Sequence, residues 1–418
     1  MKTLSKIIFL SFLSIVFSQK ILIPMDETQS DHLKAYGLAF WILEGNTNVD
    51  WMLNYKGGSF MVDYQDIIKN ECILRGIHYE LINSSQLISI YSIIEDNNMD
   101  VVLLEKAPEI AVYSPPGKQP WDDAVTLALT YAEVPYDVIF DEEVLTNKLS
   151  DYDWLHLHHE DFTGQYGKFY RNYRNASWYK KLEYDFNNTA NQFGFESVPV
   201  LKKNVALKIK EYIVNGGFIF AMCSAADSFD IALATFGVDV AHQVYDGTPI
   251  DPDYVNKINF NNAIAFENYQ LYTDPMIYEY STIDYPPSHK PSNRSLESDY
   301  FTLFEFSAKW DPVATMLTQN HVGAINGFMG QTTGFNRQFI KKHIVVLGDI
   351  ENDPMVKYIH GNSGKGTFTF LGGHDPEDYR HLVGDPKTDL SLHKNSPGYR
   401  LILNNILFPA AKKKERKT

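Results

Sequence analysis

Residues 216–229 read GGFIFAMCSAADSF, and this stretch indicates more about the fold than any other part of the chain. Residues 217–222 form a short apolar run rich in Phe and Ile, which is typical of a buried strand, and helix-forming residues follow directly. Cys223 stands at the junction, with Ala221 and Ala225 two residues to either side. A nucleophile held in a sharp strand-to-helix turn needs small neighbours of this kind, as in a nucleophile elbow. The stretch therefore predicts a central strand that ends at a candidate catalytic cysteine.

Three interpretations of Cys223 follow from this position. At a helix N-terminus its sulfur would meet free N–H groups and partial positive charge, which stabilise a thiolate and later an oxyanion. A cysteine at the end of a central strand is also commonly a buried packing residue. Cys72 is the only other cysteine of the sequence, so a Cys72–Cys223 disulfide is the third interpretation. The sequence leaves all three open.

Strands alternate with helices on both sides of this stretch. We expect an N-terminal α/β unit in residues 19–106 and a larger α/β domain in residues 107–410. Because such alternation is typical of parallel pairing, the predicted fold class is α/β with doubly wound, mostly parallel sheets. The expected strands are residues 20–25, 49–55, 78–82, 101–104, 110–116, 136–140, 154–158, 217–222, 343–347 and 366–371, and the expected helices are residues 31–44, 63–75, 84–97, 121–132, 141–148, 199–214, 224–236 and 396–407. In such folds ligands bind beyond the carboxyl ends of the strands, where the strand order switches.

The region of about residues 240–340 breaks this alternation. It is rich in Tyr, Asn, Asp and Pro and shows no clear strand–helix pattern, so we expect an irregular insertion there. An insertion of this kind can cap a ligand site, and it can equally be an ordinary surface excursion. Residues 411–418 form a short basic tail, which is typical of a solvated chain end.

The composition excludes several classes of protein. Of the 418 residues, 44% are hydrophobic, which is the fraction of a globular protein and not of a disordered one. The 52 Asp and Glu residues outnumber the 37 Lys and Arg residues and give a net charge of −15. A surface of this charge repels phosphates, so nucleic acid is not expected as a partner.

The first 18 residues have the features of a secretory signal. Lys2 and Lys6 precede a short apolar run over residues 7–17, and Val16 and Ser18 stand where a signal peptidase prefers small residues, with cleavage expected after Ser18. No later stretch approaches the roughly 20 apolar residues of a transmembrane helix. We therefore expect an exported protein, periplasmic or extracellular, with no integral membrane span.

A second candidate segment lies near the C-terminus. Residues 364–381 read GKGTFTFLGGHDPEDYRH, in which an apolar strand runs into two glycines and then His374. A thiol nucleophile needs an imidazole within hydrogen-bond reach and a carboxylate that orients the imidazole. His374 is the candidate base, with Glu377 or Asp375 as its orienting acid. The alternative is a turn in which the Gly-Gly and Asp-Pro pairs only direct the backbone.

A pair of histidines ends the strand expected at residues 154–158. Side chains alternate along a strand, so His156 and His158 share one face of the sheet. Two imidazoles in this arrangement, with carboxylates nearby, can bind zinc or a similar divalent metal ion. The alternative is a polar cluster held by hydrogen bonds. No other cofactor is predicted from the sequence.

Four further residues are candidates for binding a substrate. His159, Glu160 and Asp161 directly follow the metal candidates, and we expect them to line a pocket at the end of the strand. Asp227 lies in the first turn of the helix after Cys223 and could face the same cleft. An acidic residue at that position also simply favours the helix dipole.

The strand–Cys–helix step, followed far downstream by a strand that ends in Gly-His-x-Pro-Glu, is similar to the class I glutamine amidotransferase-like (flavodoxin-like) fold, from about residue 110 to the C-terminus. The resemblance implies Cys223 as nucleophile, His374 as base and Glu377 as the acid that orients it. Two features differ from the family pattern. Asp375 is an additional residue between the histidine and the proline, and alanines replace the glycines that usually flank the elbow cysteine.

The whole chain also resembles a group of exported bacterial proteins labelled asparagine synthetase B. The resemblance lies in four segments, MDETQSDHLKAYG (residues 25–37), DEEVL (141–145), LHLHHEDFTGQYGKF (155–169) and GGHDPEDYRH (372–381). A glutamine-dependent asparagine synthetase uses an N-terminal cysteine and a Ser-Gly-Gly-x-Asp-Ser loop for ATP. Neither occurs in this sequence, whose expected mature start is Gln19.

Together these features predict an amidotransferase-like hydrolase that acts on a carbon–nitrogen or other acyl bond. The alternative is a catalytically silent protein of the same fold that binds a sugar or a peptide, with the Tyr-rich insertion as its binding surface. Aromatic faces suit such ligands, and the chain has 26 Tyr and 26 Phe. In both cases the expected partner is a small molecule, a carbohydrate or a peptide.

Overall fold

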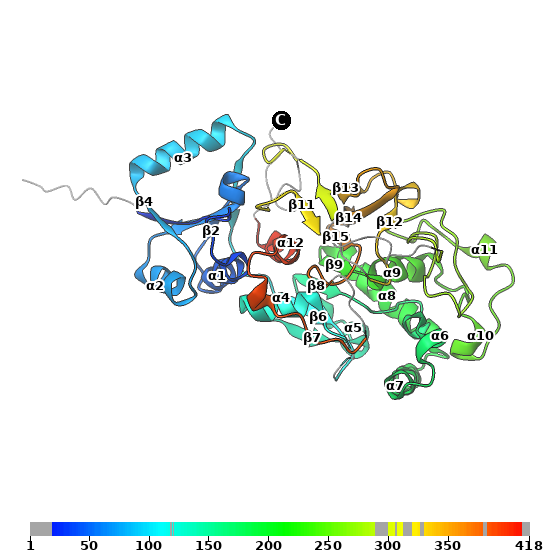
Figure 1. The fold of residues 1–418 in the computed structure, drawn as a ribbon. Coiled ribbons are helices and arrows are strands. Elements are labelled where there is room, and N and C mark those ends of the chain that lie inside the picture. Colours follow the sequence, from blue (N-terminus) through cyan, green and yellow to red (C-terminus); the bar gives the residue numbers. More distant parts are fainter. Residues whose placement is uncertain are drawn as a thin grey trace, which may run out of the picture.

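The computed structural model describes residues 19–117, 119, 121–288, 300–305, 307–311, 320–326, 330–378 and 383–411. Two β-sheets with helices on their faces make up this part of the chain (Figure 1). The predicted α/β class is therefore confirmed. The expected signal segment and all but the first residue of the basic tail lie outside the described residues.

The N-terminal sheet has five strands, in the order β4-β1-β3-β2-β5. Its strands are β1 (Lys20–Ile23), β2 (Val49–Leu53), β3 (Ser59–Asp63), β4 (Glu80–Ile82) and β5 (Asp100–Leu104). Every pairing in it is antiparallel, so the predicted parallel pairing is wrong for this unit. The reason lies in the connection of residues 54–58 between β2 and β3, because a link this short can join only antiparallel neighbours.

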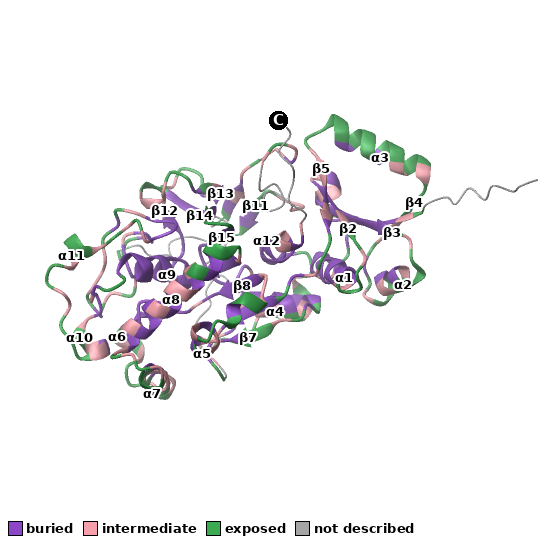
Figure 2. Cartoon of the chain, turned by 180° about the vertical axis from the view of Figure 1, so that it is seen from behind, coloured by how far each residue is buried: buried purple, intermediate pink, exposed green. Residues whose placement is uncertain are grey.

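Helices cover both faces of the N-terminal sheet. They are α1 (His32–Glu44), α2 (Asp66–Leu74) and α3 (Ser84–Asp96). The Asp31 carboxylate accepts a hydrogen bond from the N–H of Lys34 and starts α1, while Asn83 and Gln86 form a capping box that starts α3. The α1 and α2 helices pack on the face that carries Trp51, and α3 packs on the opposite face. The outer side of α3 is exposed (Figure 2).

The second sheet has a parallel half and an antiparallel half. Its strands are β6 (Ile110–Tyr113), β7 (Asp137–Ile139), β8 (Trp154–Leu157), β9 (Phe218–Met222), β10 (Tyr300–Leu303), β11 (Ala324–Asn326), β12 (Phe335–Asn336), β13 (Val345–Asp349), β14 (Met355–Ser363) and β15 (Gly366–Leu371). The strands β7-β6-β8-β9-β15 pair in parallel. Antiparallel strands continue from β15 through β14, β13 and β10 to β11, and β12 pairs with β14. The mostly parallel pairing that the sequence predicts thus describes one half of this sheet.

Two groups of helices sandwich the parallel half. The remaining helices are α4 (Ala124–Ala132), α5 (Asp141–Leu145), α6 (Tyr170–Tyr173), α7 (Ser177–Gln192), α8 (Val198–Asn215), α9 (Ser224–Ala234), α10 (Gln243–Asp246), α11 (Tyr254–Lys257) and α12 (Pro397–Ile406). Alternate residues of each strand face opposite sides. Phe218 and Phe220 of β9 pack with α4 and α12, whereas Ile219 and Ala221 pack with α5, α8 and α9.

The region of residues 240–340 is less irregular than predicted. It contains α10 and α11 and supplies β10, β11 and β12 to the antiparallel half of the sheet. The sequence analysis also missed β14, a nine-residue strand whose run of charged and polar residues breaks the apolar pattern of a buried strand. The amphipathic helix α7 was missed as well.

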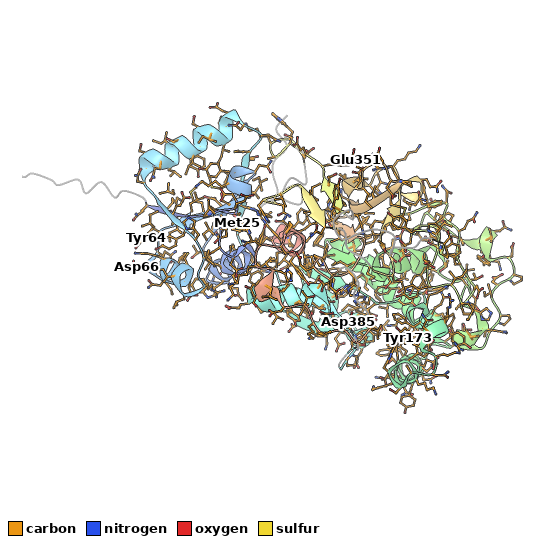
Figure 3. The ribbon with its side chains drawn as sticks, viewed as in Figure 1. Met25, Tyr64, Asp66, Tyr173, Glu351 and Asp385 are labelled. Carbon is orange, nitrogen blue, oxygen red and sulfur yellow. The ribbon has the colours of Figure 1, made fainter. Side chains whose placement is uncertain are left out.

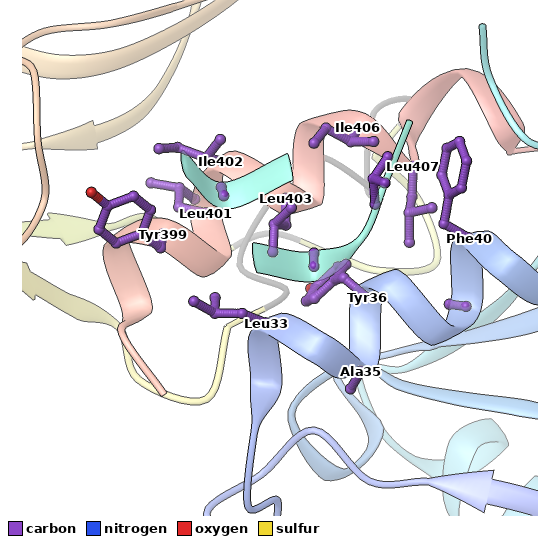
Figure 4. Close-up of a cluster of buried hydrophobic side chains, with 14 of the residues drawn as sticks. Leu33, Ala35, Tyr36, Phe40, Tyr399, Leu401, Ile402, Leu403, Ile406 and Leu407 are labelled. Atoms are coloured by element: carbon purple, nitrogen blue, oxygen red, sulfur yellow. The ribbon is translucent and has the colours of Figure 1, made fainter. Parts of the chain in front are cut away.

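The first helix joins the two sheets. Side chains of α1 such as Leu33, Tyr36 and Phe40 pack against Leu403 of α12 and Leu407, which directly follows that helix (Figure 4). The same helix lies so close to α4 that a Cβ atom on Gly37 would stand 1.7 Å from the carbonyl oxygen of Ala132. Only glycine fits there, which fixes the position of the N-terminal unit on the larger domain.

A buried arginine reinforces this contact. Arg400 of α12 is 0% exposed and donates hydrogen bonds to the carbonyl oxygens of Met25 (2.6 Å) and Gly57 and to the hydroxyl of Tyr36 (3.3 Å). Figure 3 labels Met25 at the boundary between the N-terminal unit and the rest of the chain. Arg400, near the C-terminus, thus ties α12 to the backbone of the N-terminal unit.

None of the described helices is both long enough and apolar enough to cross a bilayer.

We expect the substitution Arg400→Ala to lower the free energy of unfolding by roughly 3 kcal/mol, because it leaves buried carbonyl groups without a donor and opens a cavity. Urea unfolding measures the loss. Arg337→Ala is the matched control, because Arg337 is 48% exposed, pairs with Asp349 on the surface and should contribute less than about 1 kcal/mol. Equal losses in the two variants would contradict a joining role for Arg400.

Candidate functional site

The candidate site lies at the carboxyl ends of β6, β8, β9 and β15. In chain order the parallel strands run 2-1-3-4-5 across the sheet, so the connections after β6 and β8 leave in opposite directions. Parallel α/β sheets bind ligands at such a switch point. The described residues of the segment 114–123 after β6, which are 114–117, 119 and 121–123, and residues 158–169 after β8 border this point.

Cys223 has the backbone conformation of a strained elbow. It lies between β9 and α9 with φ 52° and ψ −138°, a region that residues other than glycine rarely adopt. Its N–H donates to the carbonyl oxygen of Leu371 at 3.2 Å, which ties it to the adjacent strand β15. Strain of this kind is worth about 1–3 kcal/mol, persists only where the surrounding structure enforces it, and is concentrated at functional sites.

A segment of the chain covers the Cys223 thiol. The residue is 1% exposed, and a Cβ atom on Gly330 would stand 2.9 Å from its sulfur and 3.3 Å from the backbone of Gly373. Burial raises the pKa of the thiol to about 11, although N–H groups of Thr332, Ser224 and Gln331 act in the opposite direction. The thiol is therefore protonated at neutral pH beneath residues 330–332, which we call the covering segment.

Both cysteines are free thiols. Cys72 is buried in α2 of the N-terminal unit, and Cys223 is buried at the end of β9. The interpretation of a Cys72–Cys223 disulfide is thus wrong, because both thiols are free and the two residues lie in different units of the chain. The two remaining interpretations are a nucleophile and a packing residue.

Asp227 holds the covering segment in place. Its Oδ1 accepts hydrogen bonds from the Thr332 hydroxyl at 2.8 Å and from the N–H of Ser228 at 3.0 Å. The side chain is 0% exposed, and burial raises its pKa to about 7. Asp227 therefore lies below the covering segment, where it anchors that segment.

Three imidazoles gather beside the elbow. The ring centroids of His159 and His374 are 3.6 Å apart, those of His158 and His159 are 3.7 Å apart, and those of His158 and His374 are 4.5 Å apart. We call these rings the histidine stack. The structure thus brings His374, from the end of β15, together with His159, from the end of β8, as the sequence analysis expects for one pocket.

A carboxylate that the sequence analysis did not select joins the other histidine pair. The Oδ2 atom of Asp123 lies 3.1 Å from Nε2 of His156 and 2.8 Å from Nδ1 of His158. Although burial alone would raise it, the charges of His158 and His156 hold the pKa of Asp123 well below its usual range. Asp123 also caps α4 through Oδ1. Its position at the start of a helix that follows β6 is the feature of the sequence that could have marked Asp123 as a site residue.

The acid expected behind His374 lies elsewhere. The Glu377 carboxylate is 3.3 Å from Nδ1 of His393, and Asp375 accepts hydrogen bonds from the hydroxyls of Tyr399 (2.7 Å) and Thr388 (2.8 Å). The role predicted for Glu377 therefore needs correction, because its carboxylate faces a different histidine. Asp375 instead anchors the segment after β15 to α12.

Asp161 organises a loop. Its two carboxylate oxygens accept the N–H groups of Thr163, Gln165 and Gly167 at 2.7–3.0 Å. These bonds occupy the side chain that the sequence analysis assigned to a substrate. Its expected place in a binding pocket is therefore corrected to a structural one.

Glu160 is buried near a second charged group. Burial raises its pKa to about 8, against the attraction of Lys202. Lys202 forms a fully buried ion pair with Asp141, which also accepts the hydroxyl of Tyr113. The charged neighbours of Glu160 thus include Lys202 of α8 and Asp141 of α5, together with Asp161 and Asp123.

A group of half-buried aromatic rings borders the histidine stack. The Trp121 ring lies 5.6 Å from His159, 5.5 Å from Phe169 and 5.6 Å from Trp178. Phe169 continues the row to Tyr278 at 5.9 Å. We call these four aromatic residues the aromatic shelf. Ring faces of this kind stack against sugars and against planar side chains.

Comparison with known proteins gives a limited result. No family model and no curated protein matches the chain. Two solved structures, the cytoplasmic proteins STM3548 from Salmonella typhimurium and STM1381 from Salmonella typhimurium LT2, are similar at 11% identity over 73% of this chain and 100% of theirs, with TM-scores of 0.36 and 0.31. A β-galactosidase from Bacillus circulans sp. alkalophilus is similar at 11% identity and a TM-score of 0.28, over 70% of this chain and 32% of its own.

Both Salmonella proteins are described as cytoplasmic, which disagrees with the expected export to the periplasm or the extracellular space. Export is therefore not proposed for this protein.

We expect Asp227→Asn to gain stability relative to the parent protein as the pH rises from 4 to 8. The pKa of the folded state, about 7, lies above that of an unfolded aspartate, so the parent has its full stability below pH 4 and loses part of it up to pH 7. Asparagine does not ionise, and the difference should reach roughly 4 kcal/mol at pH 8, since a shift of about three pKa units is worth about 1.4 kcal/mol per unit. Urea unfolding across this range measures it. Asp185→Asn, on an exposed turn of α7, should show no such trend, and a flat difference for Asp227→Asn would refute the assignment.

Proposed function

We propose that the protein is a hydrolase of a carbon–nitrogen or other acyl bond, with Cys223 as its nucleophile. The observation that carries this proposal is the backbone of Cys223, with φ 52° and ψ −138° at a strand-to-helix turn. A strained turn of this kind lifts a nucleophile out of the sheet toward bound substrate. A residue that only filled space would gain nothing from a conformation of this energy.

The topology supports the resemblance to the class I glutamine amidotransferase-like fold. The parallel strands follow the order 2-1-3-4-5, which is that of flavodoxin-like sheets. In this order Cys223 follows the fourth strand and His374 follows the fifth, so both stand at one edge of the sheet. The similarity to proteins labelled asparagine synthetase B adds no reaction to the proposal, because the ATP loop of that enzyme is absent from the sequence.

The chemistry follows from these positions. The Cys223 sulfur attacks the acyl carbon while its proton passes to the imidazole of His374, and a C–S bond forms. The carbon–nitrogen bond then breaks as His374 gives the proton to the leaving amine. Water hydrolyses the thioester by the same route in reverse and restores the thiol. N–H groups of Ser224, Gln331 and Thr332, which surround the sulfur, are available to stabilise the oxyanion.

The reaction requires the covering segment to move. Substrate has to reach a sulfur that is 1% exposed, and its approach passes the position of Gly330. The hydrogen bond between Thr332 and Asp227 holds that segment closed. We therefore assign Asp227 to positioning the covering segment.

One observation favours a second candidate function. A buried thiol whose pKa is raised to about 11 is unreactive at neutral pH, and the aromatic shelf alone suits a sugar or a peptide. A catalytically silent binding protein would use the shelf and leave Cys223 as packing.

We expect Cys223→Ala to lower kcat/KM by at least about 10³-fold for the hydrolysis of γ-glutamyl p-nitroanilide or p-nitrophenyl acetate, because the nucleophile is lost. Release of p-nitroaniline or p-nitrophenol measures the rate. Cys72→Ala, which removes the other buried thiol, is the matched control and should keep full activity. Two results would contradict the proposal. One is unchanged turnover in Cys223→Ala, and the other is a parent protein that shows neither turnover nor acylation of Cys223.

The binding function predicts a different response. Trp121→Ala should weaken an oligosaccharide or peptide ligand about 10-fold, because one stacked ring contributes roughly 1 kcal/mol. Isothermal titration with a panel of both ligand classes provides the test. Trp310→Ala is the control, because Trp310 is 70% exposed and stands outside the aromatic shelf. Equal affinities in the parent and Trp121→Ala would exclude the shelf as the binding surface.

A further inference from the structure

We infer that Asp123, His156 and His158 hold a divalent first-row transition metal ion, such as zinc or iron(II), at the carboxyl end of β8. The Oδ2 atom of Asp123 lies 3.1 Å from Nε2 of His156 and 2.8 Å from Nδ1 of His158. The three atoms all lie within 4.8 Å of one another. Two imidazoles and a carboxylate on one side of an ion form a recurrent binding site for such metals.

Donor and acceptor roles at His156 point to a cation between these groups. Its Nδ1 lies 3.1 Å from the carbonyl oxygen of Phe220, which can only accept, so Nδ1 carries the hydrogen of the ring. Nε2 of a neutral ring then directs its lone pair at the Asp123 carboxylate, which is also an acceptor. A second proton on Nε2, as in the ion pair described above, or a bound metal ion makes this approach favourable, and the ¹⁵N spectra described below distinguish the two. Histidine ligands of metals commonly donate their other N–H to a main-chain carbonyl in this way.

The orientation of the rings separates this cluster from the histidine stack. Lone pairs lie in the ring plane, so two imidazoles that share one ion meet by their edges, with centroids about 5 Å apart. His156 and His158 fit, with a centroid distance of 5.4 Å and an angle of 48°. The ring nitrogens of His158, His159 and His374 also lie within 4.8 Å of one another, but His158 and His159 lie face to face at 3.7 Å and 22°, which suits a shared ion less well. The geometry therefore assigns the ion to the Asp123 side of His158.

Spacing and burial agree with this assignment. Metal–ligand bonds of about 2.1 Å place two donor atoms on one ion about 3.0–3.4 Å apart, close to the distances from Asp123. His156 is 0% and His158 2% exposed, which excludes competing water from the rings. Asp123 uses Oδ1 to cap α4 through the N–H of Thr126 at 2.8 Å, so that Oδ2 alone faces the histidines. Mixed nitrogen and oxygen donors favour transition metals over magnesium and calcium.

The ion would support the proposed active site without touching the reacting atoms. It would fix the ring of His158, on which His159 stacks, and His159 in turn lies against His374. Its presence does not require that Cys223 is catalytic, so the inference stands apart from the proposed hydrolase.

Metal binding itself is the test. Elemental analysis of the full-length protein, purified without chelator, should find one equivalent of a transition metal. Isothermal titration of the chelator-treated protein with Zn²⁺ should give a stoichiometry of one, and titration with Co²⁺ should give visible absorption typical of low-coordinate nitrogen and oxygen ligands. Binding should weaken at least 100-fold in Asp123→Asn, which keeps an oxygen to cap α4, and in His158→Gln. His360→Gln should bind like the parent, because His360 is buried on β14 and bonded to Thr369 at 2.9 Å.

Several outcomes would overturn the inference. They are a parent protein that takes up none of Zn²⁺, Co²⁺ and Fe²⁺, an Asp123→Asn variant that binds as tightly as the parent, or a His360→Gln variant that loses binding equally.

Imidazole ¹⁵N spectra of the parent protein provide a measurement that needs no variant. The Nε2 signal of His156 should shift on addition of Zn²⁺ while Nδ1 remains protonated, and an unchanged spectrum would leave only an ion-paired polar cluster. Hydrolysis is not a readout here, so the failure of Cys223 as a nucleophile would not alter any of these results.

Discussion

The parallel hydrogen bonding of β8, β9 and β15 is the constraint on which the candidate site depends. Leu157 pairs with Ala221, and Met222 pairs with Leu371, so the three strands end at one level. Each strand then delivers a chemically active residue within three positions of its end. A shift of one residue in the register of a strand would turn each of its side chains to the opposite face of the sheet and would disrupt the site. The apolar packing of both sheet faces therefore determines where the thiol and the imidazoles meet.

The site collects buried groups that weaken the folded state. Burial raises the pKa values of Asp227 to about 7 and of Glu160 to about 8. It also raises the pKa of Asp284, which accepts the N–H of Thr333 next to the covering segment at 3.0 Å, well above its usual range. The strained backbone of Cys223 also lowers the stability of the folded state. Such groups persist because the surrounding core and the contact between α1 and α12 supply stability elsewhere in the chain. Natural proteins concentrate destabilising features where function requires them.

Local patterns in the sequence predicted the parts of the site that belong to single strands. The apolar run before Cys223, the alternation of His156 and His158 and the strand before His374 all appear in the structure as expected. Contacts between segments that are distant in the sequence could not be predicted, because they depend on the conformations of the loops between the strands. Asp123 meets its histidines across 33 residues or more, and Glu377 faces His393 instead of His374. The antiparallel N-terminal sheet differs for a related reason, since helical segments between strands do not by themselves fix their direction.

The histidine stack lies between two parts of the site that are built on opposite faces of the sheet. On one face Asp123 holds His156 and His158 against α4, and on the other Asp227 and Thr332 hold the covering segment over Cys223. His158 belongs to the first part and contacts His159 and His374, which stand at the same sheet edge as the elbow. A change in the position of His158 therefore reaches His374 through ring contacts. The chemistry proposed at the sulfur and the metal binding inferred at Asp123 thus use different atoms and share the ring contacts of the histidine stack.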